Sequence, residues 1–229
     1  MKILFIIPAR GGSKGIPGKN IKNLNGKPLI HYSIDLARQF TNDENICLST
    51  DNEAIKENAE QHGLIVPFVR PAELAQDASG THEVLIHALG FYESKGQVYD
   101  MIVLLQPTSP FRQVHHVSGA IDLYTETVDM VVSVKETASN PYYSLVEENV
   151  EGYLEKSKKG NFVRRQDCPP VYEYNGAVYV INVVSLKRES MGNFKRIKKY
   201  VMDSVSSLDL DTLLDWDFAE FLYKKGVIK

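Results

Sequence analysis

Glycines and basic side chains crowd together in residues 10–27, where their types and spacing suit the binding of an anion. The basic residues are Arg10, Lys14, Lys19, Lys22 and Lys27, with no acidic residue among them. The first glycines are Gly11, Gly12, Gly15 and Gly18. Backbone N–H groups brought close by glycine, together with Lys and Arg head groups, can replace the water and counterions of a polyphosphate. In a chain of net charge −3, this local positive charge predicts phosphate binding.

The spacing in this stretch does not fit two familiar phosphate-binding motifs. The P-loop pattern G-x-x-x-x-G-K-[ST] fits Gly18 and Lys19, but Ser13 stands where its first glycine belongs and Asn20 follows the lysine. The dinucleotide pattern G-x-G-x-x-G has no match, because no two glycines of the loop lie two apart. A P-loop kinase and an NAD enzyme are therefore disfavoured, and a surface loop without a ligand stays open as the alternative.

Two carboxylates stand two residues apart near the other end of the chain, at Asp209 and Asp211. In an extended segment they would lie on the same side and could share one hard cation. Mg²⁺ suits such a pair, because it prefers one or two carboxylates with phosphate oxygens and water. The alternative is that one of them caps the helix whose apolar residues begin at Leu213. The residues alone leave both interpretations open.

Two further polar segments stand next to predicted elements. Residues 70–81 carry Arg70, Ser79 and Thr81 ahead of a helix whose N-terminus can accept an anion or a ribose hydroxyl. Residues 106–112 follow the most hydrophobic run of the chain, and two prolines stiffen this loop. Its hydrogen-bonding side chains are Gln106, Thr108, Ser109 and Arg112. The alternative for residues 70–81 is a connector that binds no ligand. The alternative for residues 106–112 is a loop that only leads from the strand to the next helix.

A pair of arginines, Arg164 and Arg165, precedes a second polar cluster at residues 174–179, which includes Asn175 and Tyr179. Paired arginines can bind a carboxylate through two parallel hydrogen bonds. Exposed arginines are more often ordinary surface residues that contact only water. This segment therefore predicts either carboxylate recognition or ordinary surface charge.

Strand-like and helix-like patterns alternate along the first part of the chain, and they must position these side chains. The sequence predicts strands at 3–7, 46–50, 64–69, 101–105 and 130–134 and helices at 28–40, 53–62, 81–95 and 114–125. Strands separated by helices indicate an α/β fold with a Rossmann-like, mostly parallel twisted sheet flanked by helices. Ligands of such sheets bind beyond the carboxyl ends of the strands. The glycine loop and residues 106–112 both fall at that edge.

The alternation ends after residue 137. Residues 137–172 become polar with short apolar alternations, which predicts a small β-hairpin that projects from the main sheet. The aromatic residues of this insertion, among them Tyr142 and Tyr153, suggest that it contacts a partner. We therefore expect residues 1–229 to form a single domain with one insertion.

Composition bounds the class of protein. The 229 residues include 26 basic and 29 acidic side chains, a balance that argues against nucleic-acid binding. No apolar run approaches the roughly 20 residues that span a bilayer, and the first residues lack the pattern of a signal peptide. The two cysteines, Cys47 and Cys168, have no metal-ligand spacing. We expect a cytoplasmic protein without a membrane partner.

The wording of these motifs resembles one family. Residues 9–15 read Ala-Arg-Gly-Gly-Ser-Lys-Gly and residues 17–20 read Pro-Gly-Lys-Asn, which is similar to the signature of the acylneuraminate (CMP-sialic acid synthetase) cytidylyltransferases. Leu-Gln-Pro-Thr-Ser-Pro-x-Arg at 105–112, Asn-Gly-Ala-x-Tyr at 175–179 and Asp-x-Asp at 209–211 match the same family in order. The resemblance covers nearly the whole chain and implies a fold of the nucleotide-diphospho-sugar transferase type.

The resemblance also implies a role for individual residues. It implies CTP contacts at Ala9, Arg10, Gly12, Ser13, Lys14, Lys19, Asn20, Arg70 and Ser79. It implies sugar-acid contacts at Gln106, Thr108, Ser109, Arg112, Arg165, Asn175 and Tyr179. Asp209 and Asp211 would bind Mg²⁺, and Arg10, Lys19 and Asp211 would be catalytic. The family is homodimeric, and the insertion of one subunit reaches the active site of the other.

The expected reaction joins CTP to a nine-carbon α-keto sugar acid and releases pyrophosphate. The residues leave open whether this acid is N-acetylneuraminate, its deaminated form, legionaminate or pseudaminate. Some sialic acid enzymes carry arginine where this chain has Glu173, which changes the sign of the charge at that position. The alternatives are a cytidylyltransferase for the eight-carbon acid 3-deoxy-manno-octulosonate and a non-catalytic nucleotide-binding module.

Overall fold

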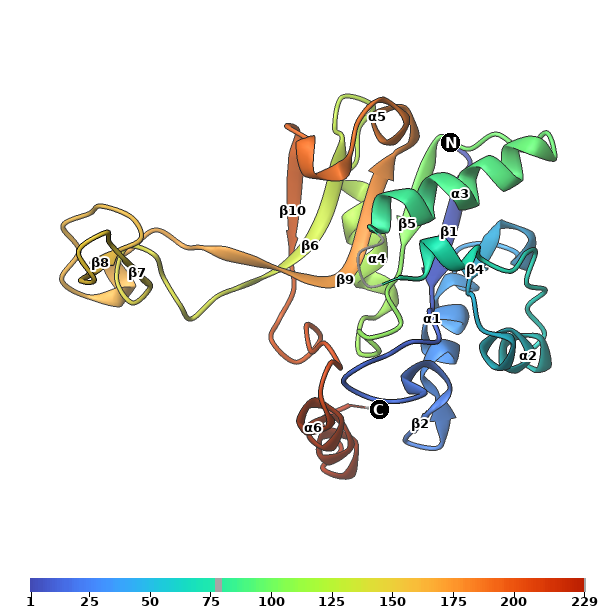
Figure 1. Ribbon diagram of the computed structural model, residues 1–229, viewed down its shortest axis with the longest axis horizontal. Coiled ribbons are helices and arrows are strands. Elements are labelled where there is room, and N and C mark those ends of the chain that lie inside the picture. The colour runs from blue at the N-terminus through green and yellow to red at the C-terminus, as the bar shows by residue number, and fades with distance from the viewer. Residues whose placement is uncertain (77–79, 229) are drawn as a thin grey trace.

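The computed structural model describes residues 1–76 and 80–228, and its centre is a six-stranded sheet in the order β10-β6-β9-β5-β1-β4 (Figure 1). The strands are β1 (Ile3–Pro8), β4 (Ile46–Ser49), β5 (Met101–Leu104), β6 (Met130–Glu136), β9 (Tyr172–Asn182) and β10 (Ile197–Val201). β1 lies parallel to β4 and β5, and β10 lies parallel to β6. β9 runs antiparallel to both β5 and β6. The sheet is therefore mostly parallel, as predicted, with one reversed strand.

Helices pack on both faces of the sheet (Figure 1). They are α1 (Leu29–Ala37), α2 (Glu53–Gln61), α3 (Thr81–Ser94), α4 (Val114–Asp122), α5 (Val183–Arg188) and α6 (Leu213–Lys224). Phe5 and Ile7 pack with residues of α1, α2 and α4, whereas Leu4 and Ile6 pack with residues of α3 and α5. β1 is thus buried on both faces, as its apolar run predicted, and the expected α/β fold is confirmed. Within the described part of the chain, no helix has both the length and the apolar character needed to cross a bilayer.

A third apolar cluster attaches α6 to the N-terminal loop. It contains Ile16, Leu24, Leu29, Phe111, Leu210, Trp216, Ala219 and Leu222. Leu24 belongs to a short hairpin, β2 (Asn23–Leu24) and β3 (Lys27–Pro28), that leads into α1. Leu210, which stands between Asp209 and Asp211 in the sequence, is fully buried. Because fully burying a side chain of this size contributes about 1.5–3 kcal/mol, Leu210 anchors the carboxylate pair.

Residues 137–171 leave the body as an arm. β7 (Val146–Glu148) and β8 (Leu154–Lys156) pair antiparallel in this arm, and Figure 1 shows them at the end of a long stalk, apart from the central sheet. The stalk begins where β6 and β9 continue their pairing to Glu136 and Tyr172. The apolar side chains of Val150, Tyr153, Leu154 and Val163 are exposed on the arm.

Several segments differ from the elements that the sequence predicts, and α1 ends at Ala37, three residues before the predicted boundary. Residues 64–69 form no strand, because Leu64 N–H donates to the Ala59 carbonyl at the end of α2 (3.1 Å) and Pro67 has no N–H to donate. α4 ends at Asp122, three residues before the predicted boundary. Residues 174–179, which the sequence presents as a polar cluster, are part of the central strand β9.

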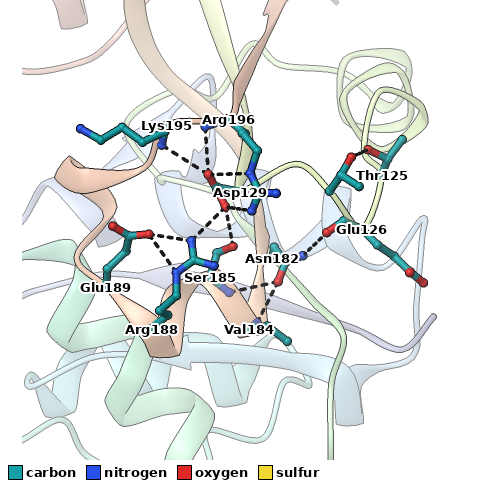
Figure 2. Close-up of polar contacts among 11 residues, drawn as sticks. Thr125, Glu126, Asp129, Asn182, Val184, Ser185, Arg188, Glu189, Lys195 and Arg196 are labelled. Carbon is teal, nitrogen blue, oxygen red and sulfur yellow. Dashed lines mark hydrogen bonds and ion pairs between the residues drawn. The ribbon is translucent and has the colours of Figure 1, made fainter.

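A buried carboxylate at the start of β6 holds α5 and β10 on the sheet (Figure 2). Asp129 is 1% exposed and accepts hydrogen bonds from Ser185 Oγ (2.7 Å), Arg196 Nη2 (2.8 Å) and Arg196 N (2.9 Å). Arg188 Nη2 lies at 3.3 Å. The hydrogen bonds from Arg196 hold the pKa of Asp129 well below its ordinary value. Since every donor comes from residues 185–196, this carboxylate ties that segment to the sheet.

Replacing Asp129 by asparagine should lower the free energy of unfolding by about 2–4 kcal/mol at neutral pH, because an amide cannot accept all these bonds. The pKa of Asp129 is lower in the folded than in the unfolded chain. Its contribution is therefore complete above about pH 4 and is lost as the pH falls toward the folded-state pKa. The variant should thus lose less stability on acidification than the wild type.

Urea unfolding from neutral to acidic pH measures both effects. Asp217→Asn, which changes an exposed carboxylate on α6, is the matched control and should stay within about 0.5 kcal/mol of the wild type. Equal stabilities of Asp129→Asn and wild type at neutral pH would contradict the anchoring role.

Candidate active site

A cleft of about 570 Å³ opens where β1 and β5 end. Its lining includes Pro8 at the end of β1 and Gln106, which follows β5. The predicted site residues among its lining are Arg10, Ser13, Lys14, Lys19, Asn20, Arg70, Gln106, Thr108, Asp209 and Asp211. Most of the predicted nucleotide-binding residues and both predicted metal ligands therefore lie around one cavity.

The glycine loop is held in place by one side chain from another segment and by one of its own. Gly11 N donates to Asp51 Oδ1 (2.9 Å), and Asn20 Nδ2 donates to the Arg10 carbonyl (2.9 Å). Gly15 packs against the backbone of Asp211, where an added Cβ would lie 2.0 Å from the carbonyl oxygen. Glycine at position 15 is required for this close approach, which places the loop directly on the carboxylate segment.

Lys19 connects the loop to the C-terminal carboxylates. It begins a short 3₁₀ helix (Lys19–Ile21) and is only 8% exposed. Its ammonium group donates to the Leu210 carbonyl (2.7 Å) and to Asp211 Oδ1 (3.0 Å). A buried ammonium needs such partners, because its water of hydration is lost. Lys19 therefore presents its charge at the wall of the cleft in one defined position.

Asp209 and Asp211 both line the cleft in different surroundings. The Asp211 side chain is 70% exposed. Burial raises the pKa of Asp209, and a hydrogen bond with Thr108 opposes that rise. Asp209 Oδ1 is buried and has no hydrogen-bond partner in the described part of the chain. Since a buried acceptor without a donor costs free energy, this oxygen is suited to ligate a cation.

The carboxylate pair has the composition of an open Mg²⁺ site, in which the protein supplies only some of the ligands. In residues 1–76 and 80–228, no group of three or more His, Cys, Asp or Glu side chains could hold a metal by itself. Mg²⁺ commonly uses one or two carboxylates and takes its remaining ligands from phosphate and water. The donor set at residues 209 and 211 has this composition.

Arg70 lies at the floor of the cleft. It is 5% exposed, and its Nε donates to Ser49 Oγ (3.0 Å) while Nη2 donates to the Ser49 carbonyl. Burial lowers its pKa, and the carboxylate of Asp51 opposes that change. The guanidinium is thus fixed at the end of β4.

Arg112 was predicted to contact a substrate, but the structure places its guanidinium beneath the cleft. Arg112 is 4% exposed, and it donates to the carbonyl groups of Gln106 and Ala177 and to Ser33 Oγ. Burial lowers its pKa to about 9, and the charge of Asp209 opposes that change. Arg112 therefore holds the 106 loop against β9. Ser109, Ala9 and Gly12 also lie outside the lining of the cleft.

A second hollow of about 530 Å³ adjoins the cleft and shares Gln106 and Asp209 with it. Asn175 and Tyr179 of β9 line this hollow. The Asn175 amide is engaged by the protein, since Oδ1 accepts from Ser133 Oγ (2.6 Å) and Nδ2 donates to Ser207 Oγ (2.8 Å). Asn175 thus fixes the backbone of the hollow.

Arg165, a predicted contact of the sugar acid, is not brought to either of these cavities. Arg165 lies at the base of the arm and lines a third hollow with Asn140 and Cys168. It lines neither the cleft nor the second hollow of its own chain. Ser79 lies outside the described residues.

Several residues of the site were missed by the sequence analysis. Asp51 accepts a hydrogen bond from Gly11 N and directly follows a predicted strand. Its position at the carboxyl end of that strand could have identified it as a site residue. Ser133 and Lys135 lie on β6, and Ser133 is enclosed by an apolar run that predicts only a core strand. Their importance follows from the pairing of β6 with β9, which the sequence pattern does not reveal.

Comparisons with known proteins agree with one another. A cytidylyltransferase family model matches residues 4–225. The chain is 34% identical to a CMP-N,N'-diacetyllegionaminic acid synthase of Legionella pneumophila, over 97% of this chain and 96% of that protein. It is 33% identical to a pseudaminic acid cytidylyltransferase of Campylobacter jejuni, over 98% and 97%. An N-acylneuraminate cytidylyltransferase of Streptococcus agalactiae is 37% identical, with 94% of this chain covering 52% of that protein.

Solved structures of more distant sequence have the same fold. A CMP:2-keto-3-deoxy-manno-octonic acid synthetase complexed with CTP superimposes with a TM-score of 0.68 at 17% identity, over 99% of this chain and 100% of that one. A 4-diphosphocytidyl-2C-methyl-D-erythritol synthase from Anaerococcus prevotii superimposes with a TM-score of 0.62 at 14% identity, over 97% and 98%. At these identities the match establishes the fold alone.

Gly15→Ala should lower the free energy of unfolding by about 1–3 kcal/mol, because the new methyl group overlaps the Asp211 carbonyl and must push the two segments apart. Gly12→Ala is the control in the same loop, since its Cβ would meet nothing within 4 Å. Chemical unfolding of both variants measures the difference. Equal stability of the two variants would show that the loop does not depend on this contact.

Proposed function

This chain belongs to the cytidylyltransferase family, and from that premise we propose that it activates a nine-carbon α-keto sugar acid with CTP. The products are the CMP-sugar and pyrophosphate. The observation that carries the proposal is the junction of the cleft and the second hollow at Gln106 and Asp209. A nucleotide in the cleft and a sugar acid in the second hollow would meet beside the carboxylate pair. Relatives at 33–37% identity are named for acids of this class, which supports the choice.

The cleft has the groups that a nucleoside triphosphate requires. CTP lies along the glycine loop with its phosphates toward Lys19, Lys14 and Arg10, all of which line the cleft. Backbone N–H groups of the loop add donors to these three cations. Arg70, fixed at the floor through Ser49, lies beneath the cytosine and reads it.

Asp209 and Asp211 would hold Mg²⁺ at the junction. When bound, the ion supplies charge neutralisation on the phosphates. Lys19 already contacts Asp211, so the ammonium group and the carboxylate pair face the same part of the cleft. This shared position supports the assignment of both to the triphosphate.

The proposed reaction is a single displacement. The 2-hydroxyl oxygen of the sugar acid forms a bond to the α-phosphorus of CTP, and its proton is released to solvent. The bond from that phosphorus to the bridging oxygen breaks, and pyrophosphate leaves with the electron pair. The chain contributes positioning and charge neutralisation, which are the main sources of catalysis in this type of transfer.

The substrate carboxylate needs a cation that one chain does not bring to the second hollow. Among the described lining residues, Lys135 is the only basic one, and it is paired with Glu173 (2.8 Å). The proposed enzyme is a homodimer in which the arm carries Arg165 of the partner subunit to this hollow. Its guanidinium can bind a carboxylate through two hydrogen bonds. The exposed apolar side chains of the arm support its burial in such an assembly.

Pyrophosphate release with CTP and Mg²⁺ should occur with one or more nine-carbon acids. The assay includes N-acetylneuraminate, its deaminated form, legionaminate and pseudaminate, with 3-deoxy-manno-octulosonate as the eight-carbon comparison. UTP, ATP and GTP are nucleotide controls and should give little release. Turnover with the eight-carbon acid alone would contradict the proposal.

Asp211→Asn should reduce turnover by at least about 100-fold, because it removes a charge from the site of phosphate transfer. Its unfolding curve should remain close to that of the wild type, since the amide oxygen of asparagine can still accept the hydrogen bond from Lys19 Nζ. Asp217→Asn removes a carboxylate that does not line the cleft and should keep its activity. Activity like the wild type in Asp211→Asn would remove the metal assignment.

The homodimer is tested by mixing two inactive variants, Arg165→Ala and Asp211→Asn. If Arg165 acts across the interface, a mixed dimer has one site with both residues intact. Random exchange of subunits should then restore about a quarter of the wild-type activity. If Arg165 acts within its own chain, no site in the mixture is complete and the activity stays at the level of the separate variants.

A further inference from the structure

One ion pair in the second hollow has no role in the proposed transfer. Lys135 of β6 lies directly opposite Glu173 of β9 in the sheet, and Lys135 Nζ is 2.8 Å from Glu173 Oε1. Both side chains line the hollow, with 36% of Lys135 and 47% of Glu173 exposed. The pair therefore faces the space in which the sugar acid is proposed to bind.

The backbone around Glu173 is paired with β6, where Lys135 lies opposite Glu173 and Glu136 lies opposite Tyr172. The β6–β9 register shifts between Val132 and Val134, and Gly176 takes a positive φ of 72° within the irregular part of β9. Such bulges redirect side chains next to binding sites. Asn175, two residues after Glu173, is fixed by Ser133 and Ser207. Glu173 is thus presented from a backbone held on both sides.

The charge of this hollow selects what can bind near Glu173. The hollow also contains Asp209, which belongs to the junction, and Asp215, which accepts from Thr212 N (2.7 Å) to begin α6. These groups and Glu173 repel a substrate carboxylate. A carboxylate has about four acceptor positions, so a single ammonium group leaves Glu173 able to accept further hydrogen bonds.

We propose that Glu173, oriented by Lys135, is a specificity-determining residue that accepts a hydrogen bond from a neutral donor on the body of the sugar acid. The donor is the N–H of an acylamino group or, more weakly, a hydroxyl group. The same carboxylate directs the acid group of the substrate to the other end of the hollow. This inference rests on the proposed function and names the feature of the substrate that the hollow reads.

The test separates the acceptor from the ion pair. Glu173→Gln keeps an acceptor oxygen, Glu173→Leu removes it, and the double exchange of Lys135→Glu with Glu173→Lys keeps an ion pair but moves the acceptor. Each variant is assayed by pyrophosphate release with acylamino and deaminated nine-carbon acids at saturating CTP. Unfolding curves and the KM for CTP show whether the fold and the cleft are preserved.

For the acylamino acid, Glu173→Leu and the double exchange should raise KM by at least about 10-fold, the scale expected when a hydrogen bond to a charged group is lost. The KM for the deaminated acid should change less, so the preference between the two acids narrows. Glu173→Gln should fall between the wild type and Glu173→Leu. The kcat and the KM for CTP should change little.

Two outcomes would overturn the inference in different ways. An unchanged preference in the double exchange, with turnover preserved, would mean that the pair only stabilises the β6–β9 contact, and the proposed function would stand. If the wild-type enzyme with CTP turns over no nine-carbon acid, and none binds in a direct titration, the proposed function and this inference both fail.

Discussion

The contact of the Lys19 ammonium group with the Leu210 carbonyl and the Asp211 carboxylate is the interaction on which the site depends. It joins segments 191 residues apart in sequence. The buried ammonium cannot keep its water, so it needs these acceptors, and Leu210 supplies one only when α6 and its apolar cluster are in place. Gly15 permits the same approach by having no side chain. The glycine loop and the carboxylate pair are therefore completed together, by the docking of the last helix.

Around this contact, buried polar groups give the site its shape. Arg112 joins the 106 loop to β9 through backbone carbonyl groups, and Asn175 joins β9 to Ser133 and Ser207. The side chains of Arg112 and Asn175 are both almost fully buried. The reversed direction of β9 matters here, because it brings the amino-terminal half of that strand to the edge where the parallel strands end. The cleft and the second hollow then adjoin, with loops of the parallel strands on one side and β9 on the other.

The parts of the fold that the sequence predicted correctly are those determined by local pattern. The apolar run at residues 3–7 requires burial on both faces, and the glycines and cations that follow must then lie at the strand end. The direction of β9 depends on distant pairing, and no local pattern encodes it. The burial of Arg112 was equally hidden, because a guanidinium beneath a loop and one facing a ligand have the same sequence. Residues 64–69 are apolar enough for a strand, but the end of α2 takes the first of their N–H groups.

β9 runs as one strand from the arm to Asn182 (Figure 1). Its residues 173–176 and 179 line the second hollow. Asn182 accepts hydrogen bonds from Val184 N (2.8 Å) and Ser185 N (3.1 Å) beside the buried Asp129, so that end of the strand is firmly held (Figure 2). An extended strand can bend but cannot lengthen. A displacement of the arm is therefore transmitted along β9 toward this fixed end, past residues 175–178, which hydrogen bonds to Ser133 and Ser207 hold in place. β9 thus connects the arm, the second hollow and the Asp129 anchor through one continuous segment of backbone.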